Sequence, residues 1–143
     1  MTVTITNSNH AKYQIGLKKI DFENDTFKMI LMKPTFIFDK DTHATLSNVT
    51  KDQIATGNGY TQNSITLTNP SASEDDTNDR FIITWNNVTV TASGGAIEDF
   101  SSVIVYDDTT ADDTIIYHAA LGTTVSLTAG LSFIANSLQT IIA

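Results

Sequence analysis

The chain is built largely from short segments in which apolar residues alternate with polar ones. Val3 and Ile5 alternate with three threonines, and Ile65 and Leu67 alternate with two more. A period of two places every second side chain on one face of a strand, as in a half-buried β-sheet. Such segments recur at roughly ten-residue spacing, with turn-forming residues between them. The sequence therefore predicts an all-β fold: a single antiparallel β-sandwich, jelly-roll or immunoglobulin-like, with about eight to nine short strands and at most one short helix.

Composition supports one soluble β domain. Threonine, whose β-branched polar side chain suits the wet face of a sheet, accounts for 23 of the 143 residues. The sequence contains no repeat and no linker-like stretch, so we interpret residues 1–143 as a single domain. It also contains no cysteine, which excludes a disulfide scaffold, thiol catalysis and cysteine-ligated zinc.

Several local structures follow from turn chemistry and hydrophobicity. Residues 81–85 and 88–92 are predicted to form a hairpin around Asn86-Asn87. Residues 103–106 are apolar at every position, which favours a central strand. Residues 51–55 are predicted to form one short helical turn. Trp85 lies among apolar residues, and we expect it in the core.

The charge distribution excludes some partners. The net charge is −8, and it is divided unevenly: residues 1–51 carry seven lysines against five acids, whereas residues 52–143 carry one arginine against eleven acids. A nucleic-acid binder needs a basic face, so direct binding of nucleic acid is not expected. No window approaches 18 apolar residues and the first ten residues lack a secretory pattern, so we expect neither a membrane span nor a signal peptide.

The sequence offers little catalytic chemistry. His10, His43 and His118 lie far apart, and none has a second ligand at metal-binding spacing. Nucleophile-elbow and phosphate-loop motifs are missing, and residues 57–59 indicate a turn. Clustered acids at 74–79 and 107–113 suggest either calcium loops or solvated loops, and we favour the second because the spaced ligand pattern is lacking. We therefore expect no enzyme, no cofactor and no metal.

A set of turn-and-strand segments, covering about residues 15–120, resembles small virion structural proteins of tailed bacteriophages. Such proteins include capsid decoration (cement) proteins, which sit on the outer shell and clamp neighbouring capsomers. The segments that carry the resemblance are residues 20–31, 38–43, 54–61, 74–80, 92–95 and 106–110, together with Trp85.

The resemblance implies a role in the virion, after synthesis in the cytoplasm of a bacterial host. The expected partner is the major capsid protein, bound on its outer surface by a homo-oligomer, a dimer or trimer at a capsid symmetry axis. Two alternatives remain open: a neck, tail or fibre component, and a β-sandwich module that binds carbohydrate or protein outside any virion.

Two segments are candidate interfaces. Residues 1–9 contain no charged side chain and are a candidate extended arm, whose Val3 and Ile5 would join the sheet edge of a neighbour. Met32, Phe36 and Phe38 gather apolar side chains around a proline and form a candidate interface patch. For both segments the alternative is packing within the domain.

Overall fold

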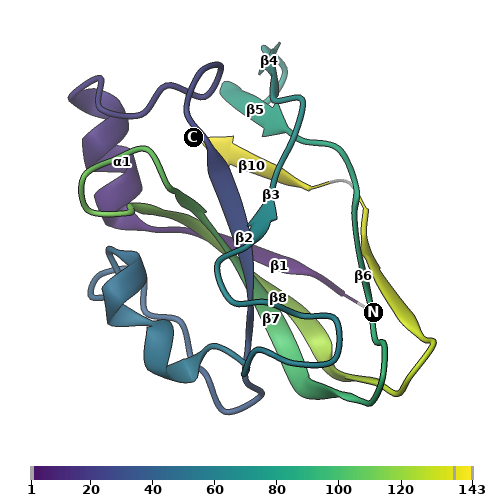
Figure 1. The fold of residues 1–143 in the computed structure, drawn as a ribbon. Coiled ribbons are helices and arrows are strands. Elements are labelled where there is room, and N and C mark those ends of the chain that lie inside the picture. The colour runs from purple at the N-terminus through teal and green to yellow at the C-terminus, as the bar shows by residue number, and fades with distance from the viewer. Residues whose placement is uncertain (1, 137, 143) are drawn as a thin grey trace.

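The computed structural model describes residues 2–136 and 138–142, and it confirms the all-β, sandwich-like fold. The described residues form ten strands, slightly more than expected, one α-helix and two 3-10 turns (Figure 1). The strands are β1 (Thr4–Asn7), β2 (Phe27–Met32), β3 (Ile65–Thr66), β4 (Ser71–Asp75), β5 (Arg80–Thr84), β6 (Val88–Thr91), β7 (Ile97–Asp107), β8 (Ile115–Leu127), β9 (Ser132–Ala135) and β10 (Gln139–Ile142). The helices are α1 (Asn9–Gly16), η1 (Leu46–Asn48) and η2 (Thr50–Asp52).

A five-stranded sheet forms the centre of the molecule, in the order β1-β8-β7-β2-β3. Two smaller sheets, β10-β5-β4 and β6-β9, complete the fold (Figure 1). Every pairing is antiparallel. The apolar segment 103–106 lies in β7, between β8 and β2, which confirms the prediction of a central strand.

Strand β2 is buried on both faces, because the chain covers both sides of the central sheet. Met29 and Leu31 face the main core, while Ile30 and Met32 face a second core. The second core is covered by residues 33–53, where the chain turns at Pro34 and folds back over the sheet. Double coverage explains why residues 29–32 of β2 are apolar at every position, without alternation.

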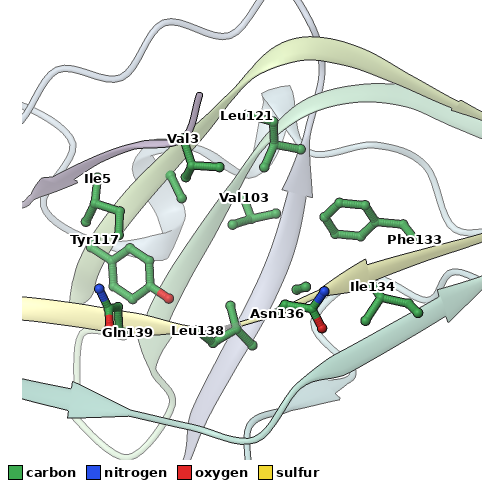
Figure 2. Close-up of a pocket in the computed structure, with 12 residues that line it drawn as sticks. Val3, Ile5, Val103, Tyr117, Leu121, Phe133, Ile134, Asn136, Leu138 and Gln139 are labelled. Carbon is green, nitrogen blue, oxygen red and sulfur yellow. The ribbon is translucent and has the colours of Figure 1, made fainter. Parts of the chain in front are cut away.

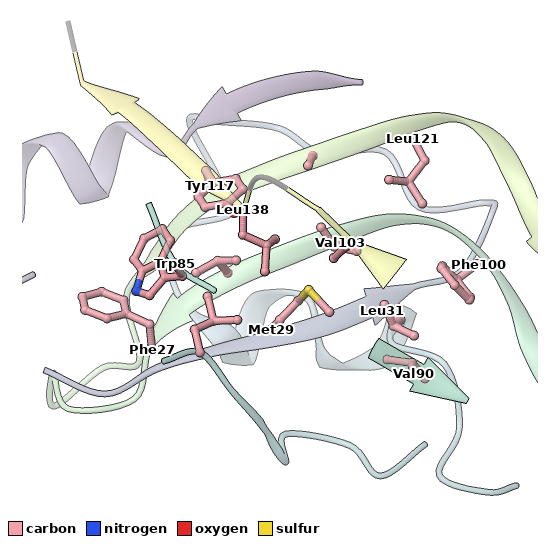
Figure 3. Close-up of a cluster of buried hydrophobic side chains, with 14 of the residues drawn as sticks. Phe27, Met29, Leu31, Trp85, Val90, Phe100, Val103, Tyr117, Leu121 and Leu138 are labelled. Carbon is pink, nitrogen blue, oxygen red and sulfur yellow. The ribbon is translucent and has the colours of Figure 1, made fainter. Parts of the chain in front are cut away.

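Trp85 lies in the main core, as predicted. Only 5% of its surface is exposed. Its ring centroid lies 5.3 Å from that of Phe27 and 6.4 Å from that of Tyr117, so it bridges strands β2 and β8 (Figure 3). Its burial removes it as an exposed platform for a sugar ring.

The predicted hairpin around Asn86-Asn87 is wrong. Strand β5 pairs with β4 and β10, whereas β6 pairs only with β9, so the two segments belong to different sheets. Both edges of β5 are already occupied, one by the preceding strand β4 and the other by β10 near the C-terminus, and the amide of Asn86 donates to the carbonyl of Thr68. The two asparagines therefore lead the chain from one small sheet to the other.

The helix also lies elsewhere than expected. Residues 51–55 hold only part of η2, while the α-helix is α1, near the N-terminus. Buried Ser8 caps it, its hydroxyl accepting a hydrogen bond from the amide of Ala11 at 3.3 Å. Ala11 is the helix residue that is buried, so the sequence of α1 has little of the apolar periodicity from which a helix is predicted.

The N-terminal segment is a strand of the chain's own sheet and not a free arm. Strand β1 pairs with β8 in a register that places Thr4 opposite Ala120 and Thr6 opposite His118. Thr2 continues along β8 as far as Gly122, where a Cβ atom would come within 2.7 Å of the Thr2 carbonyl oxygen. Gly122, at φ +76°, permits this close approach.

Deleting residues 1–7 should therefore destabilise the domain itself. The deletion removes a paired strand and the apolar contacts of Ile5, and we expect the melting midpoint to fall by at least about 5 °C. Differential scanning calorimetry of the truncated and full-length chains measures this. An unchanged midpoint would contradict the placement of β1 in its own sheet.

Replacing Trp85 with alanine should cost about 3–5 kcal/mol of unfolding free energy, because it leaves a large cavity in the main core. Urea denaturation followed by circular dichroism measures the loss. Ile37, which is 84% exposed, supplies the control: Ile37→Ala should change stability by no more than about 0.5 kcal/mol. Equal effects of the two changes would show that Trp85 contributes little to the core.

Candidate functional site

The five residues predicted to form an interface occupy two different environments. Met32 and Phe36 are buried in the second core, and Phe38 is half-buried against it. These three side chains take the alternative role, packing within the domain, because residues 33–53 fold back onto the central sheet. Val3 is half-exposed and Ile5 half-buried, and both line an apolar groove.

The groove opens between two edges of the sandwich (Figure 2). One wall is formed by Val3 and by Ile5 of β1; the other is formed by β9 and the segment leading to β10. The floor comes from the central sheet. The groove has a volume of about 230 Å³. Its apolar lining includes Val3, Ile5, Leu121, Phe133, Ile134 and Leu138.

Hydrogen bonds join the two walls at the end of the groove near Asn7. The Asn7 side-chain Nδ2 donates to the backbone carbonyl of Ile141, and the Thr140 hydroxyl donates to the Asn7 side-chain oxygen Oδ1. These contacts join the end of β1 to β10, while Val3, the residue before β1, borders the open groove. The groove is therefore a wedge between two edge strands that meet at Asn7.

The rim of the groove exposes large apolar side chains. Val3 is 50% exposed on one side, and Ile134 is 52% exposed on the other. Leu131, at the start of the β9 segment, is similarly exposed. Exposed apolar side chains are common singly, but a cluster around an apolar groove is typical of a binding surface.

The groove also lies among the uncharged parts of the chain. Residues 2–9, 81–97 and 114–142 contain no Asp, Glu, Lys or Arg, so the whole net charge of −8 arises elsewhere. These segments include β1, β6, β8, β9 and β10, and we call the surface that they form around the groove the uncharged face. The lack of charged residues from residue 114 onward is the sequence feature that could have predicted the uncharged face.

The described histidines do not form a nucleophile–base pair. His10 Nε2 lies 2.8 Å from Asp112 Oδ2, but the hydroxyl of Thr114 donates to the same carboxylate and not to the imidazole. A nucleophilic hydroxyl would have to donate to the base instead. The acids Glu98 and Asp99 are both exposed at a register shift of β7, and the Glu98 carboxylate accepts a hydrogen bond from the Ala55 amide.

The other two histidines pack with aromatic rings over the second core. His118 stacks on Phe38 at 4.9 Å between ring centroids, and His43 stacks on Phe36 at 5.3 Å. Burial, and to a lesser extent the nearby His43, lowers the pKa of His118 to about 4. His118 is therefore neutral near pH 7 and serves as a packing residue.

Among the described residues, no three His, Asp or Glu side chains gather so as to hold a metal ion. Within the same residues, no helix has the length and hydrophobicity needed to cross a membrane. No protein-family model, curated protein or solved structure matches this chain. The uncharged face with its groove is thus the strongest candidate site.

One buried acid has an unusual environment outside this face. Asp107, at the end of β7, is fully buried, and its Oδ1 accepts a hydrogen bond from the Thr109 amide. Burial, followed by a hydrogen bond with the carboxyl group of Asp25, raises the pKa of Asp107 from 3.8 to about 7. Asp25 lies in the loop before β2, so this interaction couples that loop to the end of β7.

Asp107 should make stability depend on pH. In the folded protein the carboxyl group stays protonated up to about pH 7, whereas in the unfolded chain it ionises near pH 4. Its contribution is fully present below about pH 4 and is lost as the pH rises to about 7. The variant Asp107→Asn keeps the shape of the side chain but cannot ionise. We therefore expect the variant to have a higher melting temperature than the wild type at about pH 8.

The matched control is Asp76→Asn, which removes one exposed carboxylate. Melting temperatures of the three proteins between about pH 4 and 8 provide the measurement. If Asp107→Asn retains the wild-type pH dependence, then Asp107 is not the titrating group.

Proposed function

We propose that the chain is a non-enzymatic structural protein of a bacteriophage virion, and specifically a capsid decoration (cement) protein. It would bind the outer surface of the major capsid protein as a symmetric homo-oligomer and stabilise the shell. The resemblance of residues 15–120 to small virion proteins of tailed phages supports this role, as does the sandwich-like β fold.

The observation that carries the proposal is the division of the surface by charge. All 24 charged residues lie within residues 10–80 and 98–113, while the uncharged face exposes Val3, Leu131 and Ile134 around a groove. Interface cores are depleted of charge and enriched in apolar side chains. An acidic remainder keeps a densely displayed protein soluble and repels non-specific contacts. This arrangement suits a protein that attaches through one face and turns the other to solvent.

The two alternative functions predict different behaviour of the protein. A neck, tail or fibre component would use the same face but would be present in far fewer copies. A carbohydrate-binding module relies on exposed aromatic rings, and Tyr13 is the one aromatic among the large, well-exposed apolar side chains described. Tyr13 lies on α1, outside the lining of the groove, so a carbohydrate platform has little support.

Quantitative protein gels of purified particles test the proposal. A decoration protein should be present in numbers comparable to those of the major capsid protein. Far fewer copies would favour the neck or tail, and absence from particles would overturn a virion role.

A binding assay tests the face. Ile134→Lys places a charge on the rim of the groove, and we expect it to abolish co-sedimentation with capsids that lack the protein, because a buried unpaired charge is costly. Ile37→Lys is the control on an exposed apolar residue that does not line the groove, and it should bind like the wild type. Equal binding by both variants would contradict the assignment of this face.

A further inference from the structure

Strand β1 is an edge strand without the usual protection. Among the described strands β1 pairs with β8 alone, so its other edge is open to a further strand. Edge strands are normally blocked by charged residues, proline, a bulge or short length. The edges β3 and β4 follow this rule, because β3 has two residues and β4 carries Glu74 and Asp75, whereas the edges β6, β9 and β10 on the uncharged face are uncharged like β1. By contrast, residues 2–7 are all uncharged and include no proline.

We propose that β1 pairs with β1 of a second copy of this chain, antiparallel and about a two-fold axis. Val3 and Ile5 of each copy would then reach the groove of the other. This inference rests on the proposed function only in treating the uncharged face as an assembly surface, and it names one partner of that face.

The sequence of β1 is self-complementary in this register. With the axis at Thr4, residue 4 lies opposite its own equivalent, and Val3 lies opposite Ile5 of the second copy. Paired residues point to the same side of a sheet, so the added Val3 and Ile5 face the groove, as the original pair does (Figure 2). One contact therefore satisfies the open backbone edge and fills the groove with apolar side chains.

Charge argues for a second copy as the occupant. Two molecules of net charge −8 repel each other, and the repulsion is least where their uncharged faces meet. The groove favours an occupant with aliphatic side chains, because every described residue that lines it is uncharged. Its volume of about 230 Å³ is below the ~300–1,000 Å³ of pockets that hold drug-sized ligands. The strand TVTITN of the chain itself has the required chemistry, being extended, uncharged and apolar at alternate positions.

A disulfide test is direct, because the chain contains no cysteine. In the proposed register, Thr4→Cys places two thiols on directly opposed residues, whose Cα atoms are about 4.5 or 5.5 Å apart. Both values lie within the range that a disulfide spans. Under mild oxidation Thr4→Cys should form a covalent dimer in high yield. The control is Thr66→Cys, an exposed threonine on β3 at the opposite edge of the same sheet, which should stay largely monomeric.

Light scattering on the free protein completes the test. The wild type and Ile37→Lys should have twice the mass of one chain at high micromolar concentration. Val3→Lys should have the mass of one chain, with an unchanged circular dichroism spectrum, because it places a charge in the contact.

A monomeric wild type would overturn the proposal, and so would a dimer that neither Val3→Lys weakens nor Thr4→Cys captures. Neither result depends on capsids. A monomer that still binds capsids in high copy number would leave the proposed function standing while this inference fails.

Discussion

The pairing of β7 with β8 is the interaction on which the rest of the structure depends. These are the longest strands, with 11 and 13 residues, and their outer edges receive β2 and β1. Their side chains supply apolar surface to both faces of the central sheet: Val103 and Val105 face the main core, and Ile104 and Tyr106 face the second. Each smaller element is stabilised by covering one of these faces.

The same arrangement explains where charge is tolerated. Most charged residues lie in the loops, and the edge strand β4 carries two more, whereas residues 29–32 of β2 and 100–106 of β7, which pack in the cores, carry none. Strands β1, β9 and β10 differ, because they are uncharged although part of their surface faces solvent. Solubility would favour charge at such positions, so the lack of charge there supports our proposal that this surface is an assembly surface.

Two buried ionisable groups set opposite requirements on the folded state. The folded state is most stable when Asp107 is protonated, because burial and Asp25 raise the pKa of Asp107 to about 7. The folded state is most stable when His118 is neutral, because burial and His43 lower the pKa of His118 to about 4. Acidification from about pH 6.5 to 4 therefore increases the contribution of Asp107 to folding stability and decreases that of His118. The effects of the two groups on stability largely offset each other.

Local patterns were enough to predict the all-β class, the central strand in β7 and the core position of Trp85, because alternation and hydrophobicity are properties of consecutive residues. They failed wherever a distant segment decided the outcome. Asn86-Asn87 resembles a hairpin turn, but β5 is paired on both edges by β4 and β10. Met32 and Phe36 resemble an interface until residues 33–53 cover them. The groove beside Val3 exists only because β9 and β10, more than 120 residues away in the chain, come to lie opposite β1, and such long-range contacts leave no trace in local sequence.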